Sequence, residues 1–399
     1  MDNLCIRCKG KGLCGKHCHI LDRFMNLAPK LKLHFSGKSS PEIFVGRAGY
    51  PHINSGILAP MGESNLSNFV TAKEWSANNF SIENILHVRS QLIYGKSVMD
   101  IKSPSKLKKI VQELALSTKP VSTEFFLKRK PQLEFTPDDV FRPITNPAPV
   151  KKVVLEENPW VPKKVDYLAS DYDVKASTAV TELHKAGIGI EHLQRMLSVG
   201  LLGVKAGRKM VPTRWSITAT DDIISKQQLK KIRDYPEINQ IKVFSGNFLG
   251  NYIEVLLLPG RFSFEALEVW LSENFYAGGE THFSQDYEGF FGRKSYASNV
   301  TGGYYAMRFP LTEYLEKIKR QATALIVREI RPEYYAPLGV GIVRETTRRA
   351  FSGPAKTFNS IGEALTDVQS RIRIPVSNIK EKSLILREYG KQKSLKGFL

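Results

Sequence analysis

All four cysteines of this 399-residue chain lie within its first eighteen residues. They are Cys5, Cys8, Cys14 and Cys18. Two thiolate pairs on short turns can close a tetrahedron around Zn²⁺ with no open position, which is the arrangement of a structural site. Free thiols or two disulfides are the alternatives, but disulfides are disfavoured in the cytosol. The spacing therefore predicts a structural zinc knuckle, in which His17 or His19 could replace Cys18 as the fourth ligand.

A second set of residues has side chains that transfer protons or bind a divalent metal ion. Its members are Asp221, Asp222, His282, Asp286 and Glu288. They suggest the hypothesis of acid–base chemistry, or of a second metal of unknown identity in the core. The simpler interpretation is structural, with Asp221 or Asp222 as the N-cap of a helix over residues 223–232. The other three would then lie on a polar surface loop.

Several arginines are candidate phosphate ligands, because a guanidinium group can donate two parallel hydrogen bonds to phosphate oxygens. They are Arg47, Arg214, Arg293, Arg308 and Arg344. Around Arg293 and Arg308, aromatic residues alternate with Lys, Arg and Gly, a composition suited to stacking on bases and contacting phosphates. Together with the acids, these arginines would suit an enzyme that acts on a nucleotide or a nucleic-acid phosphodiester. Ordinary turns and surface loops are the alternative.

The C-terminal peptide carries a further pattern, formed by Gln392, Leu395, Phe398 and Leu399. In a 3₁₀ turn, side chains three residues apart lie on one face, so Leu395 and Phe398 would form a small apolar cluster. Exposed apolar clusters usually mark partner sites. The arrangement resembles the peptide with which replication and repair proteins bind the DNA sliding clamp (PCNA). Docking of this end on its own domain is the alternative.

The composition favours a soluble protein that binds a polyanion. Lys and Arg number 58 against 39 Asp and Glu, which gives a formal net charge of +19. Such a charge attracts nucleic acid, and DNA is the expected partner, with RNA and the ribosome as alternatives. No apolar run approaches the ~20 residues of a membrane span, and the N-terminus lacks the apolar stretch of a signal peptide. We therefore expect a cytoplasmic, nucleoid-associated protein without membrane contact.

The elements that must position these residues indicate an α+β fold. We expect a zinc finger at 1–30, a first core lobe at 31–135, a Pro-rich extended arm at 136–165, a second lobe at 166–372 and a flexible basic tail at 373–399. Strands are expected at 43–45, 121–127, 209–222, 253–258 and 339–344. Helices are expected at 82–92, 105–116, 264–274, 311–330 and 361–371, with a helical hairpin at 177–185 and 191–199.

Motifs spread along nearly the whole chain carry a family resemblance. They are the four-cysteine group, Gly46-Arg47-Ala48-Gly49-Tyr50-Pro51, Val211-Pro212-Thr213-Arg214-Trp215-Ser216-Ile217-Thr218, Gly302-Gly303-Tyr304-Tyr305-Ala306-x-Arg308, Gly339-Val340-x-x-Val343-Arg344-Glu345 and the C-terminal peptide. These motifs resemble those of the archaeal Nre ("novel repair") family, specifically its NreA type. The resemblance implies DNA damage repair, docking to the sliding clamp and an N-terminal four-cysteine zinc finger. It brings no established reaction, so it leaves open whether the chain is an enzyme.

Overall fold

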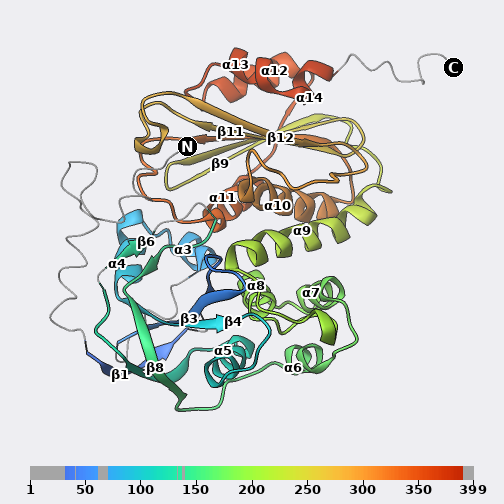
Figure 1. Cartoon of the computed structure of the whole chain (residues 1–399). Coiled ribbons are helices and arrows are strands. Elements are labelled where there is room, and N and C mark those ends of the chain that lie inside the picture. Colours follow the sequence, from blue (N-terminus) through green and yellow to red (C-terminus); the bar gives the residue numbers. More distant parts are fainter. Residues whose placement is uncertain (1–31, 41, 62–70, 133, 137–139, 390–399) are drawn as a thin grey trace. The chain divides into compact units, whose positions relative to one another are not determined.

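The structure is a computed structural model of the chain (Figure 1). It describes residues 32–40, 42–61, 71–132, 134–136 and 140–389. The predicted zinc ligands and the predicted clamp peptide lie outside these residues. The chain divides into two compact units. The N-terminal unit comprises the described residues of Asp2–Ile224 with Ala336–Gly341, and the C-terminal unit comprises those of Ser225–Tyr335 and Ile342–Leu399.

The N-terminal unit is built on a six-stranded sheet with the strand order β1-β5-β8-β4-β3-β2. Its strands are β1 (His34–Ser39), β2 (Ile43–Val45), β3 (His52–Pro60), β4 (Leu92–Asp100), β5 (Val121–Leu127) and β8 (Pro147–Leu155). The β4–β8 pair is parallel and the other pairs are antiparallel. The parallel ladder is short, because only Tyr94–Lys96 pair with Pro147–Pro149. Beyond it, β4 and β8 have no shared ladder in the described part of the chain.

Helices accompany this sheet in the N-terminal unit. They are α3 (Ala72–Ala77), α4 (Ile82–Ser90), α5 (Lys106–Leu116), α6 (Lys163–Ser170), α7 (Ala176–Lys185) and α8 (Ile190–Ser198), and a small pair of strands is formed by β6 (Phe135–Thr136) and β7 (Ile144–Thr145). The sheet core packs against α5 through Val111, Leu114 and Ala115. Ser105 caps α5 by accepting a hydrogen bond from the Lys108 backbone N–H at 3.1 Å. The predicted helices 82–92 and 105–116, and the helical hairpin, are therefore confirmed within a few residues.

The C-terminal unit contains a second six-stranded sheet with the order β12-β11-β13-β10-β9-β14. Its strands are β9 (Ile241–Phe248), β10 (Asn251–Leu258), β11 (Ser263–Trp270), β12 (His282–Glu288), β13 (Thr323–Ile330) and β14 (Lys356–Phe358). Only β11 and β13 run parallel. In Figure 1 the sheet lies between two helical layers. One layer is α12 (Ile361–Gln369), α13 (Val376–Lys382) and α14 (Leu384–Glu388), and the other contains α10 (Gly302–Ile318) and α11 (Val340–Ser352).

The α+β prediction is confirmed, but several predicted elements are wrong. Residues 264–274 form strand β11 rather than a helix, although Glu, Ala and Leu there favour helix. Burial on both faces decides the conformation, as it does in strands covered by helices on both sides. The predicted helix 311–330 is α10 followed by strand β13, and the break falls at Lys319, whose φ is +51°. The β-branched residues that follow suit a strand.

Two predicted strands are helices. Residues 209–222 are not a strand, because helix α9 (Thr213–Ile232) begins directly after Pro212. Proline fixes a φ compatible with a helix start and needs no N–H partner there. Asp221 and Asp222 consequently lie inside α9 and cap no helix. Residues 339–344 belong largely to α11, which begins after Gly339 at a φ of +82°. No helix in the described residues has both the length and the apolar composition of a membrane span.

Candidate functional site

Strand β12 carries three of the predicted acid–base residues. His282, Asp286 and Glu288 occupy even positions along it, so they share one face of the strand. The antiparallel register places Asp286 opposite Ala266 and Glu288 opposite Phe264 on β11. These are small or apolar neighbours. The two carboxylates must therefore find their polar partners in the loop and helix that follow β12.

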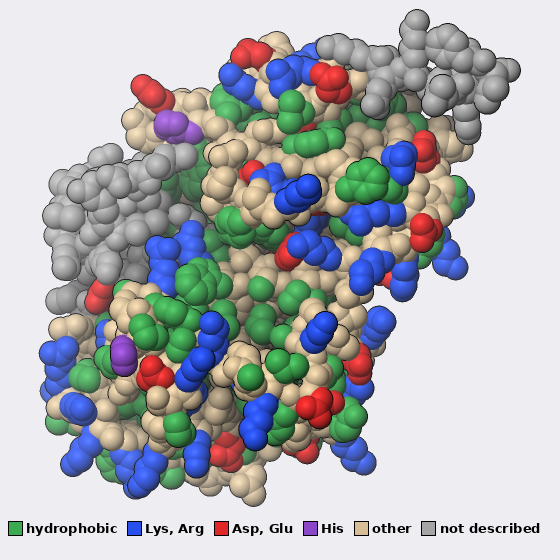
Figure 2. Space-filling model, turned by 45° about the vertical axis from the view of Figure 1, so that its right-hand side comes forward, with side chains coloured by type: hydrophobic (Ala, Val, Ile, Leu, Met, Phe, Trp, Pro, Cys, Tyr) green, Lys and Arg blue, Asp and Glu red, His purple; other side chains and the backbone are tan. Residues whose placement is uncertain are grey.

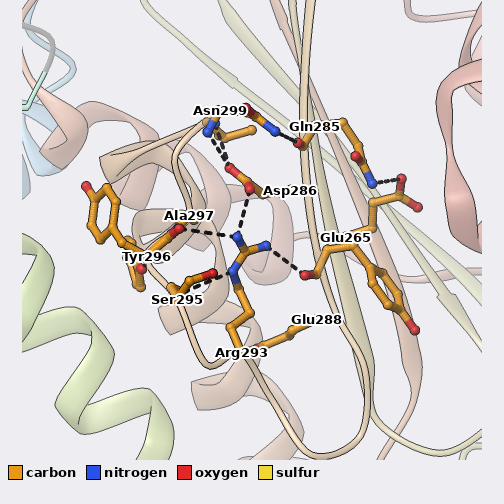
Figure 3. Close-up of polar contacts among 12 residues, drawn as sticks. Glu265, Gln285, Asp286, Glu288, Arg293, Ser295, Tyr296, Ala297 and Asn299 are labelled. Atoms are coloured by element: carbon orange, nitrogen blue, oxygen red, sulfur yellow. Dashed lines mark hydrogen bonds and ion pairs between the residues drawn. The ribbon is translucent and has the colours of Figure 1, made fainter.

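Asp286 is buried and accepts hydrogen bonds from the segment that leads into α10 (Figure 3). Its Oδ2 atom accepts from the backbone N–H groups of Asn299 and Val300 at 3.0 and 2.8 Å. Its Oδ1 atom pairs with Nη2 of Arg293 at 3.0 Å. Arg293 also donates to the carbonyl oxygen of Tyr287 at 2.7 Å. One acid and one arginine thus tie the loop of residues 289–301 to the end of β12.

Glu288 forms a second pair with Arg308 on α10. Arg308 Nη1 lies 3.2 and 3.1 Å from the two carboxylate oxygens, and both side chains are at least 98% buried. Tyr304 lies one helical turn before Arg308, and its ring centroid is 5.6 Å from the guanidinium carbon. Burial and the nearby Glu288 charge raise the pKa of the Tyr304 hydroxyl above its ordinary value, so it remains protonated at neutral pH.

These contacts limit the chemistry open to the β12 cluster, which consists of Asp286, Glu288, Arg293 and Arg308. Each carboxylate is held by an arginine in a buried setting, whereas a general acid or base needs access to substrate. His282 lies four residues from Asp286, about 13 Å along an extended strand, and its Nε2 donates to the Ala277 carbonyl oxygen at 2.8 Å. Within the described residues, no three His, Cys, Asp or Glu side chains gather as metal ligands. The β12 cluster therefore has a structural role, which is to hold the loop of residues 289–301 against the end of β12.

The other predicted residues lie elsewhere. Arg344 is buried in α11, and Asp221 is buried and Asp222 half-buried in α9. Arg47 lies exposed in the turn after β2, and Arg214 lies in the first turn of α9. These last two segments are neighbours, because the Val45 backbone N–H donates to Thr213 Oγ1 at 2.9 Å.

An aromatic contact joins the same two segments. The rings of Tyr50 and Trp215 lie 5.8 Å apart, and both side chains remain partly exposed. The structure therefore places Arg47 and Arg214 on segments that meet at a partly exposed aromatic pair. Of the predicted acid–base residues, Asp221 and Asp222 belong to the N-terminal unit, whereas His282, Asp286 and Glu288 belong to the C-terminal unit.

Sequence reasoning missed a basic pocket in the N-terminal unit. The pocket has a volume of about 630 Å³ and lies where β8 parts from β4 beside α5. Four exposed lysines line it, namely Lys106, Lys128, Lys151 and Lys152. None of them has an ion-pair partner among the described residues. The lining also contains Glu113 and Glu157, and the Glu157 carboxylate accepts a hydrogen bond from the Ser122 backbone N–H at 2.6 Å. The local signals in the sequence were the basic cluster Lys128-Arg129-Lys130 and the adjacent Lys151-Lys152 pair, and neither indicates that these lysines share a pocket.

The structural role of Asp286 gives a prediction. Asp286→Asn removes the charge that Arg293 needs and weakens the bonds from Asn299 and Val300. We expect unfolding in urea to become easier by about 1.5–3 kcal/mol, the usual contribution of hydrogen bonds to a charged group. Amide hydrogen exchange at residues 289–301 should accelerate. Glu280→Gln, at an exposed position, is the control and should change neither measurement. Unaltered stability and exchange in the Asp286 variant would contradict this role.

Comparison with known proteins gives consistent results along the whole chain. The family model for the archaeal Nre N-terminal region matches residues 13–277, and the model for the archaeal Nre C-terminal region matches residues 288–398. No solved structure shows a significant match.

Three relatives are similar over most of their length. DNA repair protein NreB of Archaeoglobus fulgidus is 35% identical over 399 residues, covering 99% of this chain and all of the relative. DNA repair protein NreA of the same organism is 35% identical over 390 residues, covering 96% of each chain. DNA repair protein NreA of Haloferax volcanii is 33% identical over 360 residues, covering 87% of this chain and 85% of the relative. The chain therefore belongs to the archaeal Nre family.

Proposed function

We propose that this chain is a DNA repair factor that binds DNA and is recruited to the DNA sliding clamp (PCNA) through its C-terminal peptide. The observation that carries the repair role is the full-length similarity, at 35% identity, to relatives named DNA repair proteins. Because the similarity extends over both units, the role belongs to the whole chain rather than to one shared domain.

The clamp contact rests on the sequence of the last eight residues. In the proposed complex, Gln392 would hydrogen-bond beside an apolar pocket of the clamp, and Leu395, Phe398 and Leu399 would fill that pocket. Burying each of these apolar side chains contributes about 1.5–3 kcal/mol. Part of this is lost in ordering the peptide. The remainder suits a moderate, reversible contact, which DNA binding by the rest of the chain would reinforce through effective concentration.

A structural Zn²⁺ is part of the proposal. Cys5, Cys8, Cys14 and Cys18 are its proposed ligands, with His17 or His19 as a possible replacement for Cys18. Such a site supplies on the order of 10–16 kcal/mol to a short segment, enough to fold it without a large core. Elemental analysis of the purified chain should find one zinc per molecule, lost on Cys→Ser substitution. A chain without bound zinc would contradict this assignment.

The charge distribution supports contact with DNA. Figure 2 shows blue Lys and Arg side chains scattered over the visible face, with fewer red acidic ones among them. In the N-terminal unit, the lysine-lined pocket joins positive charge to concave shape. Arg47 and Arg214 are further proposed phosphate contacts on the same unit. Phosphate contacts of this kind supply most of the affinity in non-specific DNA binding.

The clamp contact can be tested by pull-down with the purified clamp. Removing residues 392–399, or replacing Leu395, Phe398 and Leu399 together by Ala, should abolish capture of the full chain because the pocket loses its apolar ligands. Lys393→Ala changes a spacer position and is the control, which should bind normally. Undiminished capture of the truncated chain would exclude the C-terminal peptide as the docking segment.

The lysine pocket gives a second test, based on the salt dependence of DNA affinity. Changing Lys106, Lys128, Lys151 and Lys152 to Gln should lower the slope of log K against log [salt] by about three to four, close to one for each lost phosphate contact. A matched control changes the exposed Lys163, Lys185, Lys205 and Lys209 to Gln, with the same loss of charge. Equal slopes for the two variants would contradict a DNA contact in the pocket. A change seen only with structured RNA would instead favour an RNA-binding role.

A further inference from the structure

The loop after β12 makes a tight turn whose two corner residues are both phenylalanine. The Gly292 backbone N–H donates to the Gly289 carbonyl oxygen at 2.9 Å, so Phe290 and Phe291 occupy the two central positions. Gly292 has a φ of +83°, a conformation that glycine adopts without steric cost. Central turn positions normally favour Pro, Asn, Asp, Ser or Gly. Two large apolar rings at this place therefore need an explanation other than turn formation.

The two rings have different environments. Phe290 is half-buried, and the guanidinium groups of Arg261 and Arg233 lie 3.7 and 5.7 Å from its ring centroid. Phe291 is 91% exposed. The next most exposed large hydrophobic residues in the described part of the chain are Val98 at 63% and Tyr167 at 62%. Phe291 also has no polar atom to offer water, so nearly its whole ring surface is left exposed.

Positive charge lies close to the turn that carries this exposed ring. Arg261 and Lys294 are exposed, and Arg233 is half-buried next to Gly292, with its Nη2 atom close to the glycine. The nearest acids of β12 are already neutralised, because Asp286 pairs with Arg293 and Glu288 with Arg308. An exposed aromatic ring on a turn that is flanked by cations is complementary to a base between phosphates.

The loop is also held in place. Arg293 bonds to Asp286 and to the carbonyl oxygens of Tyr287 and Tyr296, at 3.0, 2.7 and 3.3 Å (Figure 3). Tyr296 stacks on Tyr305 of α10 with ring centroids 5.2 Å apart. An anchored loop loses little backbone freedom when it binds, which favours affinity. The exposed position of Phe291 is thus fixed by the fold.

We propose that Phe291 stacks on an unpaired base of DNA, with Lys294 and Arg261 contacting the flanking phosphates. This inference rests on the proposed DNA repair function and specifies its substrate as DNA that contains unstacked or unpaired bases. A fully paired duplex offers no free base face without unstacking, which costs a few kcal/mol per step. The loop would therefore distinguish distorted from regular DNA without reading sequence.

The test uses the full chain and fluorescence anisotropy with three DNAs of one length and salt concentration. They are a paired duplex, the same duplex with a central unpaired patch, and a single strand. Phe291→Ala should weaken binding to the unpaired patch and the single strand by about five-fold or more, the loss of one base–aromatic stack. Its effect on the paired duplex should be smaller. Phe291→Trp should keep wild-type affinity because it keeps the stacking surface.

Tyr167→Ala, which removes another exposed ring on α6, is the matched control and should bind all three DNAs normally. Equal affinities of Phe291→Ala and wild type for the unpaired DNAs would overturn the inference while leaving the repair function intact. The inference would also be overturned if Phe291→Ala weakened only the capture of a protein partner in a pull-down, or only the binding of matched RNA. If the wild-type chain bound none of the DNAs, the DNA contact of the proposed function would fail together with the inference.

Discussion

Two arginine–carboxylate pairs at the end of strand β12 determine the structure around the loop of residues 289–301. Asp286 and Glu288 are buried, and an unpaired buried charge costs several kcal/mol, so each needs a cation at hydrogen-bonding distance. Arg293 supplies one from the loop itself and Arg308 supplies the other from α10. The sheet, the loop and the helix are therefore coupled through charge. The exposure of Phe291 depends on this coupling, because the same bonds fix the turn that carries it.

Parts of the fold could be predicted from local sequence. Strand β5 has alternating burial and matches its sequence pattern, and α5 begins at the Ser105 cap that its sequence indicates. Strand β11 could not be predicted in this way. Its Glu265 and Glu268 favour helix, but Glu265 is buried and accepts hydrogen bonds from Ser383 Oγ and the Leu384 backbone N–H. These partners lie more than a hundred residues further along the chain, where local propensity gives no information.

The same distinction holds for the candidate sites. Residue type alone made Asp286, Glu288, Arg293 and Arg308 candidate site residues. The structure shows that they form ion pairs with one another. The path by which the loop and α10 return to the end of β12 brings these partners together, and this path is not visible in the residues themselves. The lysine pocket depends on the point where β8 parts from β4, and it joins Lys106 to Lys151 from distant segments. The zinc ligands and the clamp peptide remain predictions from spacing, since they lie outside the described residues.

The role we propose for the β12 pairs is to present a DNA-contacting loop. Photo-cross-linking tests this most directly, using DNA with a halogenated pyrimidine in an unpaired patch and mass spectrometry of the digested full-length chain. We expect adducts on the peptide that contains Phe291, and fewer adducts when the same base is paired. Adducts found only on other peptides, with none on residues 289–296, would contradict it.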